Sequence, residues 1–108
     1  MAGGFGDMSS LLKQAQDMQR RMQETQRQLG EASVEGAAGG GAVRVTLNGN
    51  REIQSIKIDP AVVDPSDVDG LEDLLLVALR QGLQAAKELH DAEMAKVTGG
   101  MNLPGMGF

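Results

Sequence analysis

Two segments with helical spacing of apolar residues enclose a short central segment with alternating spacing. In the first, apolar positions recur at alternating steps of three and four residues, the a/d pattern of an amphipathic helix. These positions are Met8, Leu11, Ala15, Met18, Met22, Thr25 and Leu29. Asp7 or Ser9 is suited to cap the start and Gly30 to end the helix. The pattern predicts a helix from about Asp7 to Gly30.

The segment at residues 42–47 alternates apolar and polar residues, as a half-buried strand does. The residues that share its apolar face are Val43, Val45 and Leu47. The segment before it, at residues 31–41, has Val34 as its one large apolar residue. That composition fits either a weak edge strand or a loop.

Asn48-Gly49-Asn50 is typical of a hairpin turn, because glycine and asparagine tolerate positive φ. A two-residue loop sets Val45 opposite Glu52, whereas a three-residue loop sets it opposite Ile53. We prefer the three-residue loop, because it pairs two apolar residues.

With that register, Ile56 and Ile58 fall on the opposite parity from Ile53. The change of parity predicts a β-bulge near Gln54-Ser55, where one extra residue shifts the pairing. The strand is expected to end at Asp59-Pro60, because proline cannot donate to the ladder.

A second long helix is predicted after the turn at residues 64–67. Asp69 and Glu72 form a capping-type start, and Gly99-Gly100 ends the helix. Its apolar stripe comprises Leu71, Leu74, Leu75, Ala78, Leu79, Leu83, Ala86 and Leu89. Small residues at Ala78, Gly82 and Ala85 allow close approach of another backbone.

The element order predicts an α+β subunit: helix, two or three antiparallel strands, helix. We expect one domain over residues 7–98, between flexible tails at residues 1–6 and 99–108. A strand of seven residues spans about 23 Å, whereas a helix from Gly70 to Val97 spans roughly 42 Å. The helices therefore overhang the sheet, which predicts a homodimer with projecting helices. The expected core and dimer contacts are Met18, Met22, Val43, Val45, Ile56, Ile58, Leu75 and Ala78.

Composition narrows the function. The 108 residues include no Cys, Trp or Tyr and one His, which disfavours thiolate metal sites and acid–base or nucleophilic catalysis. We expect no enzyme activity, no cofactor, no metal and no small-molecule substrate. No apolar run has the length of a membrane span, and a signal peptide is not evident, so we expect a cytoplasmic protein without membrane contact.

The net charge of −5 is unevenly distributed. Residues 8–58 hold seven Lys/Arg against five Asp/Glu, whereas residues 59–108 hold three against nine. Lys13, Arg20 and Arg27 share one heptad position, so they form a basic stripe with steps of about 10.5 Å. Such a stripe can follow the phosphates of a duplex. It also fits an ordinary solvated helix, since Asp17 and Glu24 lie four residues after Lys13 and Arg20.

Short motifs spread over nearly the whole chain point to one known family. They are Leu12-Lys13-Gln14-Ala15-Gln16, Met18-Gln19, Met22-Gln23, Val34-Glu35-Gly36, Gly39–Gly41, Val43-x-Val45-x-Leu47-Asn48-Gly49, Ile56-x-Ile58-Asp59-Pro60, Leu71-Glu72-Asp73-Leu74 and Leu103-Pro104-Gly105. In this order and combination they resemble the YbaB/EbfC family of nucleoid-associated proteins.

The resemblance implies a helix–three-strand–helix subunit in a tweezer-like homodimer, with residues 31–38 as the first strand. It also implies binding of double-stranded DNA with modest sequence preference, in the nucleoid, and a role in nucleoid organisation and gene regulation. The projecting helices of the family contact DNA, so Lys13 is carried over as a DNA-binding residue. The other candidates rest on the stripe or on the far end of the second helix: Arg20, Arg21, Arg27, Lys87 and Lys96.

Two features depart from the family pattern. Where many relatives read Ala-x-Asn-Glu/Asp-Ala, this chain has Ala78-Leu79-Arg80-Gln81-Gly82, and the second helix also carries Glu88, Asp91 and Glu93. These carboxylates repel phosphate. The alternative function is therefore an acidic helical scaffold that recruits replication or recombination proteins, with DNA contact incidental.

Overall fold

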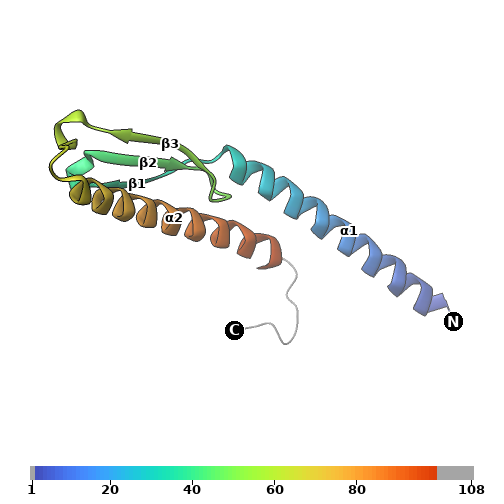
Figure 1. The fold of residues 1–108 in the computed structure, drawn as a ribbon. Helices are drawn as coiled ribbons and strands as arrows, with labels where there is room; N and C mark the ends of the chain where they lie inside the picture. The colour runs from blue at the N-terminus through green and yellow to red at the C-terminus, as the bar shows by residue number, and fades with distance from the viewer. Residues whose placement is uncertain (1, 100–108) are drawn as a thin grey trace.

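The protein is described by a computed structural model covering residues 2–99, with side chains from Met8 onward (Figure 1). The chain forms helix α1 (Ala2–Glu31), strands β1 (Val34–Ala38), β2 (Val43–Leu47) and β3 (Ile53–Ile58), and helix α2 (Val68–Gly99). Short 3-10 turns at Gly39–Gly41 and Pro60–Val62 connect them. The predicted α+β order is confirmed. The segment at residues 100–108, expected to be a flexible tail, lies outside the described residues.

The three strands form one antiparallel sheet in the order β1-β2-β3, and α2 packs across β1 and β2. The alternation predicted for β2 sets the core, because its three odd-numbered residues are fully buried against α2. The residues at the centre of this core are Val43, Val45, Leu47 and Ala78. Strand β3 extends beyond the cover of α2, so one edge of the sheet has an open apolar side.

A close backbone crossing fixes α2 on the sheet. A Cβ placed on Gly36 of β1 would overlap the carbonyl oxygen of Ala78 and the backbone nitrogen of Gly82. In addition, the N–H of Ala37 donates to Oε1 of Gln81 at 2.6 Å. The close approach predicted for the small residues of the second helix is confirmed at Ala78 and Gly82.

The predicted hairpin register is wrong, because the loop between β2 and β3 is longer than the three residues expected. Val45 pairs with Ile56, not Ile53, and Leu47 pairs with Ile53. The side chain of Asn48 extends the loop, since its Oδ1 accepts from the N–H groups of Asn50 and Glu52 at 2.9 and 3.0 Å. The predicted bulge is confirmed, because the register shifts between Thr46 and Leu47 and leaves one extra residue in β3.

The hairpin loop also anchors α1. The N–H of Gly49 donates to the carbonyl of Leu29 at 2.7 Å, and Nδ2 of Asn50 donates to the carbonyl of Gln26 at 3.0 Å. Leu29 is 2% exposed. From this fixed base α1 projects away from the sheet (Figure 1), which is the overhang predicted from the element lengths.

Several predicted boundaries are corrected. Helix α1 begins at Ala2 rather than near Asp7, so residues 2–6 are helical rather than a tail. An established helix extends by one hydrogen bond per residue, so weak helix formers can join it. The first strand, expected at residues 31–38, begins at Val34, because α1 continues past Gly30 to Glu31.

The cap of α2 is also corrected. Helix α2 begins at Val68, and Oδ1 of Asp67, rather than Asp69, accepts from the N–H of Gly70 at 3.1 Å. Asp67 therefore stands at the N-cap position, from which a carboxylate reaches the third helical N–H.

The expected core and dimer contacts divide into three groups. Val43, Val45 and Ala78 are buried, and Leu75 packs against them. Ile56 and Ile58 are 45% and 37% exposed, so they lie outside the core of this chain. On the projecting helix Met18 is half-buried and Met22 is 39% exposed.

None of the helices in the described part of the chain is long and apolar enough to span a membrane.

Candidate nucleic-acid interface

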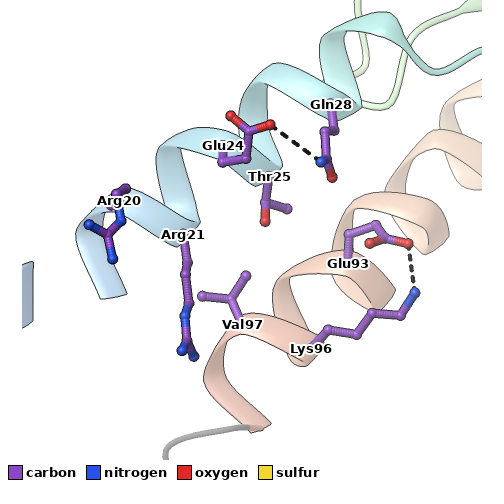
Figure 2. A pocket seen from close by; sticks show the side chains of 8 residues that line it. All are labelled: Arg20, Arg21, Glu24, Thr25, Gln28, Glu93, Lys96 and Val97. Atoms are coloured by element: carbon purple, nitrogen blue, oxygen red, sulfur yellow. Dashed lines mark hydrogen bonds and ion pairs between the residues drawn. The ribbon is translucent and has the colours of Figure 1, made fainter. Parts of the chain in front are cut away.

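Helices α1 and α2 enclose a cleft of about 450 Å³ where the end of α2 runs beside α1 (Figure 2). Thr25 and Val97 form its inner part, since Thr25 is half-buried and Val97 is 7% exposed. Thr25 belongs to the a/d pattern of α1, and Val97 continues the apolar stripe of α2 beyond Leu89. The full lining comprises Arg20, Arg21, Glu24, Thr25 and Gln28 from α1, and Glu93, Lys96 and Val97 from α2. We refer to this site as the helix cleft.

The helix cleft brings together three of the predicted DNA-binding cations: Arg20, Arg21 and Lys96. Arg20 donates to Asp17 at 2.7 Å and Lys96 donates to Glu93 at 3.0 Å. Arg21 has no ion-pair partner among residues 8–99 and extends from α1 beside Val97 (Figure 2). Its guanidinium is therefore available to an anion in the cleft.

Arg27 lies apart from this group, although it shares the predicted stripe with Arg20. Its guanidinium donates to the carboxylates of both Glu24 and Glu31, the second at 2.9 Å. The hydrogen bond to Glu24 is the main reason that the pKa of Arg27 is raised, and the same bond lowers the pKa of Glu24. Two carboxylates thus neutralise this cation.

The remaining predicted cations occupy other surfaces. Lys13 lies on the exposed projecting part of α1 and has no ion pair with any residue from 8 to 99. Lys87 donates to Asp91 at 2.7 Å, and its hydrogen bond is the main cause of the lowered pKa of Asp91. Lys87 lines a different hollow, together with Arg51 and Arg80.

Sequence reasoning did not select Arg51 or Arg80 as site residues. Arg51 follows the predicted turn directly, and its approach to α2 depends on how the hairpin folds against the helix. In the sequence, Arg80 stands out only as a departure from the family pattern. The signal was the pair Arg80 and Lys87, which are seven residues apart and so lie on one face of a helix.

The arrangement can hold anions electrostatically. Three basic side chains line one open cleft between the two helices, against the two carboxylates of Glu24 and Glu93, so positive charge is in excess. The amide of Gln28 has two N–H groups, one of which donates to Glu24. In the part of the chain that the structure describes, no three His, Cys, Asp or Glu side chains are grouped so that they could hold a metal ion.

Comparison with known proteins identifies relatives over nearly the whole chain. A nucleoid-associated protein of Clostridium novyi is 52% identical over 104 residues, covering 96% of this chain and 91% of that protein. One of Moorella thermoacetica is 50% identical over 102 residues, covering 94% and 98%. One of Alkaliphilus metalliredigens is 48% identical over 104 residues, covering 96% and 91%.

Among solved structures, the crystal structure of an uncharacterized protein from Helicobacter pylori matches with a TM-score of 0.69 and 23% identity, covering 90% of this chain and 95% of that one. This match shows a shared fold. The model of the YbaB/EbfC DNA-binding family matches residues 4–101. The chain is therefore a member of the YbaB/EbfC DNA-binding family.

Proposed function

We propose that this protein is a nucleoid-associated protein that binds duplex DNA through the phosphate backbone, with little sequence preference and without catalysis. The convergence of Arg20, Arg21 and Lys96 on the helix cleft carries the proposal. Its setting is the bacterial nucleoid in the cytoplasm, where it alters DNA conformation and influences gene expression. The names of its relatives support this setting.

Phosphate contact explains how an acidic protein can bind DNA. With a net charge of −5, the whole molecule does not attract DNA from a distance, so affinity depends on cations gathered at one site. Contacts to phosphate position a protein on the duplex and carry no sequence information. Low sequence preference follows from this mode of binding.

A homodimer completes the proposal. Strand β3 and the outer side of α2 expose apolar side chains that a second copy would cover. They are Ile53, Ile56, Ile58, Leu76 and Val77. A dimer carries two helix clefts, and two linked sites bind one duplex more tightly than either site alone.

The test compares two variants that each lose two cations. R21Q/K96Q removes cations of the helix cleft, and K13Q/R27Q removes cations of the stripe outside it. Binding to a labelled random duplex is measured by fluorescence anisotropy between about 50 and 200 mM salt, where log K falls by about 0.9 for each phosphate contact. We expect R21Q/K96Q to reduce the slope by more than one contact, because Arg21 has no ion-pair partner among residues 8–99 and Lys96 has one carboxylate partner, against the two of Arg27. K13Q/R27Q should lose one contact at most, because Arg27 is already neutralised.

Absence of binding by the wild-type protein at low salt contradicts the proposed function. Equal slopes for the wild type and R21Q/K96Q contradict the helix cleft as the DNA site and leave the rest of α1 as the candidate.

The exposed side of α1 favours one second candidate, the acidic helical scaffold. Met8, Leu11 and Leu12 are each at least 63% exposed on the projecting helix. A helix with uncovered apolar positions can dock a partner helix, such as one of a replication or recombination protein. Heparin chromatography at low salt separates the candidates, since a scaffold of this net charge should pass through and a phosphate-binding protein should be retained.

A further inference from the structure

A second basic hollow lies between the β2–β3 hairpin and α2, outside the helix cleft. Its lining consists of Arg51 from the hairpin and Arg80, Leu83, Gln84 and Lys87 from α2. The hollow measures about 440 Å³ and opens to solvent. We refer to it as the hairpin hollow.

Arg51 has a backbone conformation that is unusual for its residue type. Its φ is +67°, in the left-handed region, where a Cβ is unfavourable and glycine is the usual occupant. The turn imposes this φ, since the N–H of Arg51 donates to the carbonyl of Asn48 at 3.1 Å and the N–H of Asn48 donates to the carbonyl of Glu52 at 3.0 Å. Strained residues of this kind concentrate at functional sites.

The charges of the hairpin hollow are only partly compensated. Within residues 8–99, neither Arg51 nor Arg80 forms an ion pair. Lys87 is paired with Asp91, and that one carboxylate also lies close enough to Arg51 for the arginine charge to help lower its pKa. Three cations that face one hollow repel one another. An anion bound between them removes that repulsion and accepts hydrogen bonds from both guanidinium groups.

We propose that the hairpin hollow is a second phosphate-binding site, which holds the backbone of the duplex bound at the helix cleft. This inference rests on the proposed function and extends it to a surface away from the tip of the projecting helix. The bound group is a phosphate, because arginine forks bind its oxygens in a bidentate manner.

Two observations favour the DNA backbone over a free phosphate or nucleotide. The hollow is open, whereas sites for small molecules enclose most of the ligand surface. The hairpin that carries Arg51 is also bonded to the end of α1 through Gly49 and Asn50, so the hollow lies at the base of the helix that contributes to the cleft.

The test uses R51Q/R80Q and a matched control, R44Q/K57Q, in the full-length protein. Arg44 and Lys57 are paired across β2 and β3, on the sheet face opposite the core, so both variants lose two charges. In the anisotropy titration with random duplex between about 50 and 200 mM salt, R51Q/R80Q should lower the slope by about two contacts at 0.9 each. The control should keep the wild-type slope.

Each other outcome overturns the inference. If the wild type binds DNA and R51Q/R80Q retains its slope, the hairpin hollow is not a DNA site, while the helix cleft can still be one. If both variants lower the slope equally, net charge rather than the hollow is responsible. The inference is also overturned if sedimentation shows that R51Q/R80Q changes the oligomeric state and the control does not, because Arg51 and Arg80 then belong to a protein interface.

The phosphate source is tested by NMR. Amide shifts of Arg51 and Arg80 in the wild type are followed during titration with a short duplex and, separately, with inorganic phosphate. Shifts that saturate only with the duplex support a backbone site. Saturation with inorganic phosphate alone shows a site for small anions and overturns the assignment to DNA.

Discussion

Individual cations of α1 differ in their availability, although their spacing makes them look equivalent. Lys13, Arg20 and Arg27 share one heptad position, yet Arg27 binds two carboxylates and Lys13 binds none among residues 8–99. The heptad pattern predicts that the three side chains share one face of the helix. It does not predict which cation is neutralised, because i,i+3 and i,i+4 partners compete for each side chain.

Releasing Arg27 from its partners should create a new phosphate contact. In E24Q/E31Q the guanidinium keeps its charge and loses both carboxylates, so duplex affinity should rise and the salt slope should steepen by about 0.9. E72Q/D73N removes the same number of negative charges away from α1 and serves as the control, because neither carboxylate forms an ion pair among residues 8–99. Anisotropy titrations check both variants. Equal strengthening in the two variants would show a general effect of net charge.

Elements of the fold were predictable where local periodicity decides them. The alternation of Val43, Val45 and Leu47 predicted the buried face of β2, and all three are fully buried. The register of β3 was not predictable, because Asn48 lengthens the loop through side-chain hydrogen bonds. The helix cleft depends on the angle between two helices distant in sequence, so its three cations could be proposed singly but not as a group.

The crossing of α2 over β1 provides a test at this scale. Gly36→Ala should destabilise the protein by about 1–3 kcal/mol or more, because its Cβ overlaps backbone atoms that cannot move as a flexible side chain does. Gly99→Ala is the control, since a Cβ there meets no atom within 4 Å. Thermal unfolding by circular dichroism measures both. An unchanged melting temperature for Gly36→Ala would mean that the helix and sheet separate easily at this crossing.

The whole molecule is elongated, with principal extents of 79 × 26 × 16 Å. Such a shape leaves apolar side chains uncovered, and they collect on β3 and the outer side of α2. The sequence predicted the need for a partner from element lengths. It placed Ile56 and Ile58 in one set of core and dimer contacts. Alternation along a strand shows which face a side chain lies on, but it does not show whether the same chain or a second copy covers that face.

A charge on the open side of β3 should therefore separate the protomers. In Ile56→Glu a carboxylate replaces an apolar side chain that is 45% exposed in the single chain. A dimer would bury that carboxylate without a partner, which is strongly unfavourable. Sedimentation equilibrium should give the mass of a dimer for the wild type and of a monomer for this variant.

Lys57→Gln is the matched control, because it changes the net charge equally on the opposite face of the same strand, and it should remain a dimer. Loss of the dimer should also weaken binding to a long duplex by about an order of magnitude or more, since two linked clefts raise affinity through their effective concentration. If Ile56→Glu stays dimeric, the apolar surface of β3 is not the interface. The two clefts would then have to be joined through another surface, of which the uncovered side of α1 is the next to test.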